Sequence, residues 1–535
     1  MNGEKGGWTW CMLIAVCATI VLSDPIFAAD SETEPSTSQA TSQPTNGVET
    51  DFGNMFQANC AVCHGEHMAG SAQGTPLVGT VLKHGEDMAG LVRSITDGYT
   101  DVGMPAWGKV LSTQEIKRLA LWISEHRSGL LYSDFKISSE LEIPDQPVNT
   151  ELYRLELQTI ADGLDPLPYS IAPLPNGSLL VTEKMRGLRI VAPTGAISEL
   201  IVGTPKTYDD ARTGGGGLEY GMGWLLDVAV HPNYAENGWV YLHYTDRCSD
   251  CNKASRESGR SVSMNALVRG RIRNNHWVDE EVLWKAAIED YMPSSDVAAG
   301  GRIAFDPDGY VFLSIGMQSI EGIQNLESAH GKVLRLHDDG RIPIDNPFVN
   351  NPHALNEIWS YGHRSPQGLE YDAQTRVLWE TEHGPRGGDE INRLVAGHNY
   401  GWPLFSHGQN YDGTEVAWGK TLGIETELKD IDQPIVDLTP SPAISSFVIY
   451  TGDAFPAWKN SFIVGSLKAT DVYRIELQED KLIHQETIIE NLARIRDIEI
   501  DKDGTLLLLL EHATGGKIVR VSPHRDATEQ AVTAN

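Results

Sequence analysis

From about Glu151 onward, the chain consists of short strand-like runs that follow turn signals. Asn-Gly, Asp-Gly and Pro-containing turns precede apolar or alternating segments, a pattern typical of β-strands. Six such stretches recur at intervals of about 45 to 85 residues: LPNGSLLVTEK, HPNYAENGWVYLHYTD, DPDGYVFLSIG, DAQTRVLWETEHG, FPAWKNSFIVGSLK and DKDGTLLLLLEHA. One supersecondary unit repeated at such periods predicts a β-propeller of about six blades, because a generic β-sandwich has no such repeat.

The N-terminal region has a different pattern. An apolar run, CMLIAVCATIVLS, follows a segment that contains Lys5 and precedes DPIFAAD, an order typical of a signal peptide cleaved near Ala28. The run is too short to span a bilayer with ease; an uncleaved anchor and a lipid attachment at Cys17 are the alternatives. The next segment, DSETEPSTSQATSQPTNG, has almost no apolar residues, so we expect a disordered linker.

A haem-attachment pattern follows this linker. The letters CAVCH place Cys60, Cys63 and His64 in the Cys-x-x-Cys-His order of c-type haem proteins. In this pattern two thiols form thioethers with the haem vinyl groups and the imidazole binds the iron. The spacing is needed because all three side chains must reach one rigid porphyrin from one helical turn. The sequence therefore predicts a covalently bound haem c.

A second axial ligand is expected about forty residues later. The segment DGYTDVGMPAWG offers Met104, and an amphipathic helix is predicted in STQEIKRLALWISEH. The stretch from Asp51 to about Gly129 resembles small c-type cytochromes, whose methionine ligand lies in a Met-Pro loop. Met68 and Met88 are the alternatives. Ligation by His and Met raises the haem potential and favours electron transfer.

These patterns predict a multi-domain protein in which a small all-α cytochrome c domain precedes an all-β six-bladed propeller. We expect a signal peptide over 1–28, a disordered linker over 29–50, the cytochrome c domain over 51–130, a second linker over 131–150, the propeller over 151–522 and a tail over 523–535.

Charge narrows the choice of partners. The formal net charge is -31 at pH 7, which argues against nucleic acid, because binding to nucleic acid depends on Lys and Arg at the phosphates. It favours neutral molecules or basic proteins as partners. No stretch after the N-terminal run is long and apolar enough to span a bilayer. We therefore expect a periplasmic or secreted protein with no membrane span in the mature chain.

Several loops of the predicted propeller resemble the soluble quinoprotein sugar dehydrogenases, also called the glucose/sorbosone dehydrogenase family. The segments that carry the resemblance are SYGHRSPQGLEY, TEHGPRGGDEINRL, HNYGWPLF, GSLKATDVYRIEL and ENLARIRDIEI. The resemblance extends from about Leu164 to Val521. It implies a six-bladed propeller that binds pyrroloquinoline quinone (PQQ) and calcium.

The family's cofactor contacts are matched in this sequence. The resemblance implies that PQQ contacts the side chains of Arg364, Lys468, Arg494 and Arg496. It also implies that calcium contacts the backbone carbonyl groups of Gly384 and Pro385. PQQ is a planar tricarboxylate, so one lysine and three arginines suit its charge. Salt-bridged surface charges are the alternative interpretation of these residues.

The substrate side departs from the family pattern. Related sequences place a catalytic histidine shortly before a Gly-Arg pair, and here that position falls on Ala298 or, with a one-residue shift, on Val297. A glutamine that contacts substrate in the family falls on Met222. Asp296 is the nearest ionisable group and is the candidate catalytic base, although it is equally interpreted as a capping residue. Further candidates are the loop histidines, His330, His363 and His383, whereas His231 is expected to be structural.

Two cysteines remain after haem attachment. Cys248 and Cys251 are expected to form a short-loop disulfide in an oxidising compartment. A redox-active pair needs cationic surroundings, and DRCSDCN offers mostly acids. A metal site would need two more ligands.

The hypothesis that joins these features is an exported quinohaemoprotein. Its propeller would oxidise an aldose or a related hydroxyl or aldehyde substrate, and its haem would pass the electrons to a downstream acceptor protein. The alternative is a propeller that has lost catalysis and serves as a ligand-binding or scaffold module.

Overall fold

The structure is a computed structural model that describes residues 46–131, 135–214 and 218–525. The predicted signal peptide (1–28), most of the first predicted linker and most of the predicted tail lie outside the described residues. Among the described residues, no helix has the length and apolar character needed to cross a membrane.

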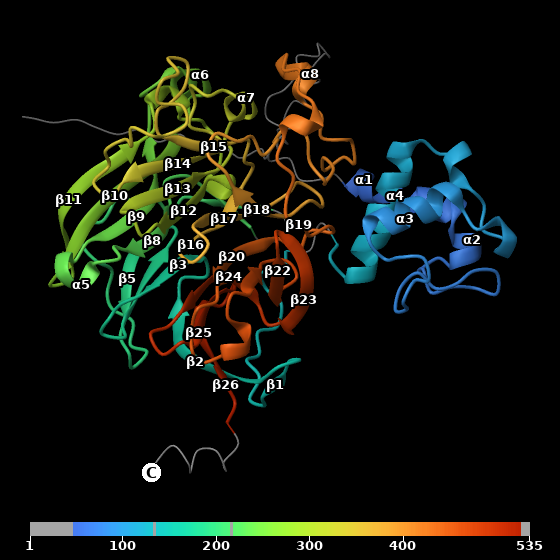
Figure 1. Ribbon diagram of the computed structural model, residues 1–535, viewed down its shortest axis with the longest axis horizontal. Coiled ribbons are helices and arrows are strands. Elements are labelled where there is room, and N and C mark those ends of the chain that lie inside the picture. The colour runs from blue at the N-terminus through green and yellow to red at the C-terminus, as the bar shows by residue number, and fades with distance from the viewer. Residues whose placement is uncertain (1–45, 132–134, 215–217, 526–535) are drawn as a thin grey trace, which may run out of the picture. The chain divides into compact units, whose positions relative to one another are not determined.

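The N-terminal domain is helical, as Figure 1 shows in blue. Its elements are α1 (Asn46–Asn59), α2 (Ala61–His64), α3 (Met88–Asp97) and α4 (Thr113–Ser128), with single 3₁₀ turns at Thr100–Val102 and Trp107–Lys109. Helix α1 begins inside the segment predicted to be a linker. In α4, Ser112 and Glu115 form a reciprocal capping box at the start, and Gly129 ends the helix in a left-handed conformation.

The apolar faces of these helices form one core. Phe56 and Trp122 lie with ring centroids 5.2 Å apart, and Leu119 of α4 and Leu91 of α3 are buried beside them. This core explains why the amphipathic pattern over STQEIKRLALWISEH forms a helix, since α4 buries its apolar stripe here.

The second domain is a six-bladed β-propeller whose blades are antiparallel sheets around a central channel (Figure 1). From the inner strand of each sheet outward, the first three sheets contain β3 (Pro168–Pro173), β4 (Leu179–Glu183) and β5 (Gly187–Val191); β8 (Leu225–Val230), β9 (Val240–Cys248), β10 (Val262–Arg273) and β11 (His276–Lys285); and β12 (Gly300–Phe305), β13 (Tyr310–Ile315), β14 (Lys332–His337) and β15 (Ile358–Tyr361). The last three sheets contain β16 (Pro366–Asp372), β17 (Val377–Glu382), β18 (Glu390–Leu394) and β19 (Val436–Asp437); β20 (Ile444–Ile449), β21 (Phe462–Ser466), β22 (Val472–Gln478) and β23 (Lys481–Ile489); and β24 (Arg494–Ile500), β25 (Leu506–Glu511), β26 (Gly516–Pro523), β2 (Arg154–Leu164) and β1 (Val148–Asn149).

Shorter elements lie in the connections of the propeller. They are a ribbon of β6 (Arg212–Thr213) and β7 (Glu219–Tyr220), the helical turns α5 (Tyr234–Asn237), α6 (Lys253–Ser258), α7 (Ile320–Ile323) and α8 (Gly419–Leu422), and the 3₁₀ turns Ile288–Asp290, Asp296–Ala298, Leu428–Asp430 and Pro456–Trp458.

The six repeated sequence stretches each supply the second strand of one blade. Strands β4, β13, β17, β21 and β25 lie within these stretches, and β9 extends two residues beyond its stretch. The prediction of six repeated units is therefore confirmed. Strands such as LLLLLE in β25 are buried along their whole length, because each blade packs against a neighbour on both faces.

The ring closes by pairing the two ends of the propeller sequence. Strand β2 pairs with β26 in the sheet that also contains β25 and β24, and β24 lies beside β3 of the first blade. Closure therefore joins the last blade to the start of the propeller sequence, and the outer strand of each blade remains as an edge.

All six inner strands contain an irregularity in their register, at Pro168/Ser170, Leu225/Val228, Gly300/Ile303, Pro366/Gly368, Ile444/Phe447 and Ile495/Asp497. Such bulges change the direction in which side chains point from a strand. Beyond them, the inner strands surround a cavity of about 190 Å³ that is lined by residues of every blade, including Asp227, Arg302 and Asp497.

Candidate active site

The predicted haem-attachment segment forms one helical turn. The backbone N–H of Cys63 donates to the carbonyl of Cys60 at 3.1 Å, and that of His64 donates to the same carbonyl at 2.9 Å. His64 Nδ1 lies 2.8 Å from the carbonyl oxygen of Thr75. A proton on Nδ1 is therefore fixed toward Thr75, which leaves Nε2 to bind a metal.

The two thiols lie beside this imidazole. Cys60 and Cys63 are both free and half-buried. Burial, together with the neighbouring Cys63, raises the pKa of Cys60 to about 11, so Cys60 is a thiol rather than a thiolate at neutral pH. Because both lie on the turn that carries His64, they are arranged as attachment to one porphyrin requires.

The three methionines considered as axial ligands have different surroundings. Met68 is only 2% exposed and belongs to the helical core, and Met88 begins helix α3. Met104 is half-buried in a tight loop, where its N–H and carbonyl pair with the backbone of Tyr99 at 3.0 and 2.9 Å. The geometry therefore favours Met104, and its role as ligand stays a prediction.

In the propeller, three cations share a single buried carboxylate. Glu511 Oε1 lies 3.0 Å from Nζ of Lys184 and 2.7 Å from Nε of Arg496, and Glu511 Oε2 lies 2.9 Å from Nε of Arg494. Burial alone would raise the pKa of Glu511, but the three positive charges hold it well below its usual range. The group has more positive than negative charge, so it suits an anionic ligand.

The strand register explains how two arginines reach one carboxylate. Arg494 of β24 lies directly opposite Glu511 of β25, and Arg496 lies at the irregularity between Ile495 and Asp497. Residues two apart on a strand point to the same face, so both arginines reach Glu511 across this irregularity.

The other predicted cofactor residues are linked to this group. Arg496 Nη1 donates to Gln367 Oε1 at 2.9 Å, and Gln367 Nε2 donates to the Ser365 side chain at 3.0 Å, beside Arg364. Arg494 Nη1 lies 3.4 Å from the carbonyl of Leu467, which precedes Lys468. Arg364, Lys468, Arg494 and Arg496 are all at least nine-tenths buried. The structure thus links Arg364, Arg494 and Arg496 and places the backbone beside Lys468 next to them.

His383 lies in the same positive surroundings. Burial, Arg496 and Arg364 together lower its pKa to about 3, so the imidazole is uncharged. Its Nε2 atom is buried and has no hydrogen-bond partner among the described residues. An unpartnered polar atom beside excess positive charge indicates a place for a polar ligand.

The predicted cation loop is a tight turn after β17. The N–H of Gly384 donates to Asp389 Oδ1 at 3.0 Å. A Cβ atom at Gly384 would lie 2.1 Å from the carbonyl oxygen of Gly387, so only glycine fits. The carbonyl groups of Gly384 and Pro385 are hard oxygen donors of the kind that calcium prefers.

Asp296 is placed as a hydrogen-bonded anchor. It is 2% exposed, and its two oxygens accept hydrogen bonds from four donors: the Gly223 N–H at 2.6 Å, Thr245 Oγ1 at 2.5 Å, Ser263 Oγ at 2.6 Å and Gln318 Nε2 at 2.7 Å. Burial raises its pKa to about 6, against the effect of these bonds. A carboxylate with four donors has no acceptor position left for a substrate hydroxyl. The geometry favours a positioning role, and the catalytic assignment stays a prediction.

The position expected for the family histidine lies beside an aromatic cluster. Val297 and Ala298 belong to the 3₁₀ turn that Asp296 begins. Ala299 packs with Tyr169, Trp224 and Leu226 in one buried cluster.

The candidate histidines are engaged in other contacts. His330 Nε2 lies 2.9 Å from the Asp290 carbonyl, and burial lowers its pKa to about 4. His363 Nδ1 forms an ion pair with Glu380 at 2.9 Å. His231 Nδ1 accepts from the Asn233 N–H at 2.9 Å, as expected for a structural residue.

Sequence reasoning missed Lys184 and Glu511. Lys184 directly follows the second strand of its blade, as His383 does, and Glu511 is the last residue of the second strand of its blade, as Glu382 is. Aligning the ends of the stretches LLVTEK, VLWETEH, FIVGSLK and LLLLLE would have grouped them, because equivalent positions of a propeller meet at the same end of its channel.

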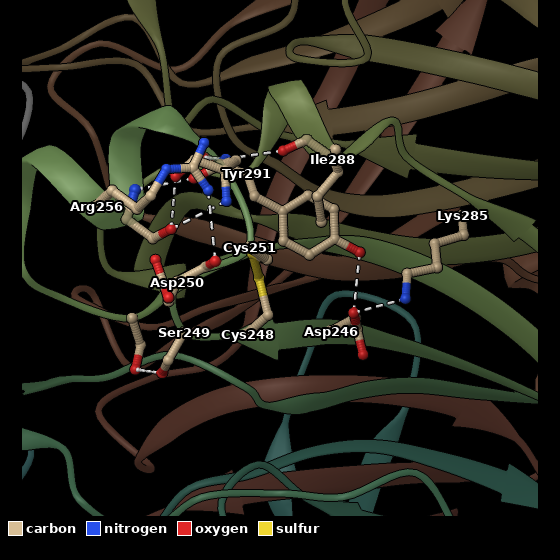
Figure 2. The surroundings of a disulfide bond; sticks show 12 residues. Asp246, Cys248, Ser249, Asp250, Cys251, Arg256, Lys285, Ile288 and Tyr291 are labelled. Carbon is tan, nitrogen blue, oxygen red and sulfur yellow. Dashed lines mark hydrogen bonds and ion pairs between the residues drawn. A yellow bond between two sulfur atoms is a disulfide. The ribbon is translucent and has the colours of Figure 1, made fainter.

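The predicted disulfide is confirmed between Cys248 and Cys251, whose Cα atoms lie 6.1 Å apart. Figure 2 shows the bridge near Tyr291, whose hydroxyl lies 3.0 Å from Asp246 Oδ2. The adjoining Asn252 donates from Nδ2 to the carbonyls of Ile288 and Tyr291, both at 2.8 Å. The bridged loop therefore braces the segment that leads to Asp296.

Comparisons with known proteins agree with this architecture. The model of the glucose/sorbosone dehydrogenase family matches residues 166–520, and that of the cbb3-type cytochrome c oxidase subunit III matches residues 50–123. The aldose sugar dehydrogenase YliI of Escherichia coli (strain K12) is 33% identical over 374 residues, which cover 69% of this chain and 93% of that protein.

Two solved structures are similar to the propeller. A glucose dehydrogenase has a TM-score of 0.60 at 31% identity, with 69% of this chain and 100% of that chain covered. The soluble aldose sugar dehydrogenase of Escherichia coli in its apo-form has a TM-score of 0.57 at 31% identity, with the same coverage. The chain therefore belongs to the glucose/sorbosone dehydrogenase family, with a cytochrome c domain preceding its propeller.

Proposed function

We propose that this chain is an exported quinohaemoprotein that uses PQQ and calcium to oxidise an aldose or a related hydroxyl or aldehyde substrate. The electrons would pass to a haem c bound covalently in its own cytochrome domain, and from there to a downstream acceptor protein. The observation that carries the proposal is the buried group in which Lys184, Arg494 and Arg496 share one carboxylate, Glu511.

The residues present fit PQQ in their charge and in the geometry of their hydrogen-bond donors. Arginine forks pair with carboxylates in bidentate fashion, and a lysine adds a compact charge. Arg494 and Arg496 would hold one side of the tricarboxylate, and Arg364 and Lys468 would hold it from two other blades. PQQ, when bound, supplies a quinone that takes up two electrons from an alcohol or aldehyde carbon. Calcium at the carbonyls of Gly384 and Pro385 would polarise an oxygen of a ligand placed there.

The cytochrome domain supports the proposed electron transfer. Cys60 and Cys63 would form the thioether bonds, and His64 and Met104 would bind the iron. Fusion of the acceptor to the propeller raises its effective concentration over that of a free cytochrome.

An observation also favours a second candidate function. Ala298 or Val297 occupies the position of the family's catalytic histidine, and neither side chain can accept a proton. A propeller that binds a ligand without oxidising it, attached to an electron-carrying cytochrome, is the alternative that follows.

Reconstitution of the purified haem-containing protein separates the two functions. Apo-protein would be titrated with PQQ in calcium and in chelator, and binding followed by quenching of tryptophan fluorescence. A panel of aldoses and simple alcohols would then be added while haem reduction is recorded by absorption. Calcium-dependent PQQ binding with substrate-dependent haem reduction supports the dehydrogenase. PQQ binding without haem reduction on any substrate supports the scaffold, and absence of PQQ binding contradicts the proposal.

A matched pair of variants makes the binding test specific. Arg496→Gln removes one charge from the buried group, and Arg393→Gln removes one from an exposed ion pair. We expect only the first to weaken PQQ binding, by at least about tenfold, which corresponds to one charge-assisted hydrogen bond.

Export would be tested by fractionation. Recovery of the haem-containing protein in the periplasm or medium, with a mature N-terminus near Ala28, supports it. A cytoplasmic chain that retains residue 1 contradicts it.

A further inference from the structure

Lys184 has an unusual environment for a lysine. It directly follows strand β4 and is 7% exposed, and its Nζ atom lies 3.0 Å from Glu511 Oε1. Nζ also lies 5.5 Å from the ring centroid of Tyr169 and 5.7 Å from that of Trp224. The amine is thus enclosed by one carboxylate and two aromatic rings, and it belongs to the cationic group proposed to hold the cofactor.

These rings connect Lys184 to the position that lacks the family histidine. Tyr169 and Trp224 pack with Ala299, the residue that follows Ala298. The Tyr169 hydroxyl donates to the Gly300 carbonyl at 2.6 Å. The amine therefore contacts the two rings whose cluster reaches the vacant position.

Other titratable groups near this end of the channel are less suited to accept a proton. Both oxygens of Asp296 are used by four donors. His363 is held between the carboxylates of Glu380 and Glu382. His383 lies among the positive charges of Arg496 and Arg364, which oppose any further proton.

We propose that Nζ of Lys184 is the proton acceptor in the oxidation, in place of the histidine that this chain lacks. The inference rests on the proposed function. The proton of the substrate hydroxyl moves to the uncharged Nζ of Lys184, which becomes an ammonium group. The hydrogen on the same carbon leaves with two electrons, which the quinone accepts, and a carbonyl product remains. The ammonium returns its proton to solvent, so no further co-reactant is needed.

The electrostatic surroundings are consistent with this role. Burial and the neighbouring charge of Arg496 lower the pKa of Lys184 to about 7, and Arg494 acts in the same direction, whereas Glu511 opposes them. These groups face Nζ from β24 and β25, and the Tyr169 ring faces it from β3. A base works best when its pKa lies near the working pH. An uncharged amine can donate one hydrogen to Glu511 and keep its lone pair for the substrate.

Two substitutions of Lys184 distinguish a role as a base from a role as a positive charge. Lys184→Arg presents a permanent positive charge to Glu511 and cannot lose its proton at neutral pH. Lys184→Met removes both charge and basicity at similar length. Lys459→Met is the matched control, because Lys459 forms an exposed ion pair with Asp453. All four proteins would be loaded with haem, PQQ and calcium, and their PQQ affinities and thermal melting would be measured alongside haem reduction.

We expect Lys184→Arg to bind PQQ within about threefold of the parent but to lose haem reduction by at least about 100-fold, the usual contribution of a general base. In the parent, kcat/KM should rise with pH through about 7, and this rise should be absent in Lys184→Met. Retention of activity and of the pH profile in Lys184→Arg overturns the proposal. So does weakened PQQ binding that accounts for the whole loss, since Lys184 would then only hold the cofactor.

A measurement on the apo-protein needs no catalysis. Lysine Nζ labelled with ¹⁵N would be titrated by NMR, and the signal of Lys184 assigned by its absence in Lys184→Met. A titration near pH 7 supports the proposal, and an ammonium that persists above pH 9.5, about one unit below the usual lysine pKa, overturns it. If the parent protein binds no PQQ, the proposed function itself fails, and the NMR titration distinguishes that failure from an error about Lys184 alone.

Discussion

The carboxylate of Glu382 holds the backbone of Arg364, because its Oε2 atom accepts a hydrogen bond of 2.6 Å from the Arg364 N–H. The same oxygen lies 3.3 Å from the N–H of Ser365, and Oε1 lies 3.3 Å from Nδ2 of Asn392. Glu382 therefore receives donors on both oxygens. It sets the position of an arginine that the proposed function assigns to the cofactor.

Glu382→Gln is expected to lower both stability and cofactor affinity. The glutamine amide would place an NH₂ group where one carboxylate oxygen now accepts hydrogen bonds, so the donors on that side lose their acceptor. Each buried polar group left without a partner costs about 1–3 kcal/mol. Urea unfolding would measure the stability, and fluorescence titration would measure PQQ binding. The exposed Glu425→Gln serves as the control. Equal behaviour of the two variants would contradict the role given to Glu382.

The ion pair of His363 and Glu380 makes a prediction about pH. Burial by itself lowers the pKa of His363, but Glu380 and Glu382 outweigh it and raise the pKa to about 9. Burial raises the pKa of Glu380 to about 7. Because both groups bind protons more tightly in the folded state, the stability they contribute is present at low pH. It is lost as pH rises through about 7 and then about 9.

Removing one partner tests this pair. His363→Leu leaves two buried carboxylates without their cation and is expected to cost about 3–5 kcal/mol. The double variant His363→Leu/Glu380→Leu replaces the pair by apolar side chains and should recover most of that loss. Denaturant unfolding between pH 6 and 9 would show a weaker pH dependence in the double variant. A double variant less stable than the single one would refute the assignment.

The choice of axial methionine can be tested with two substitutions. Met104→Ala should lower the haem midpoint potential and abolish the charge-transfer absorption of Met-ligated ferric haem, since the sulfur ligand raises the potential. Met68→Ala should leave both unchanged but destabilise the helical domain by about 2–5 kcal/mol, because Met68 fills its core. Redox titration and thermal unfolding measure the two effects, and a reversed pattern would identify Met68 as the ligand.

The disulfide is expected to stabilise the propeller modestly. Cys248 and Cys251 close a loop with a sequence separation of 3, and loop-closure entropy for so short a loop is worth about 2 kcal/mol. Cys248→Ser/Cys251→Ser should therefore lower the propeller's unfolding free energy by about this amount and leave the haem spectrum unaltered. A change in the haem spectrum would show that loss of the bridge also alters the cytochrome domain.

Asp296→Ala is predicted to act through stability. Four donors would lose their acceptor, at a cost of about 1–3 kcal/mol or more. Single-turnover quinone reduction, measured on the folded fraction, should proceed at the parent's rate if Asp296 only anchors its neighbours. A large fall in that rate would support Asp296 as the catalytic base.

Features formed by residues close in the chain were predictable from the sequence. The blades arise from turns followed by apolar runs, so each repeated stretch, such as that ending at Lys184, indicated its own strand. Cys60, Cys63 and His64 lie on one turn, and Cys248 and Cys251 are close enough to bridge without the rest of the fold. In such cases the local backbone geometry alone brings the groups together.

Only the tertiary structure decided which distant residues form the site. Lys184 and Glu511 lie 327 positions apart in the chain and meet because the propeller closes into a ring. Asp296 accepts hydrogen bonds from donors in four separate segments, which favours a positioning role for this candidate base. Charge, burial and available lone pairs depend on what packs around a group, and no local pattern in the sequence specifies that.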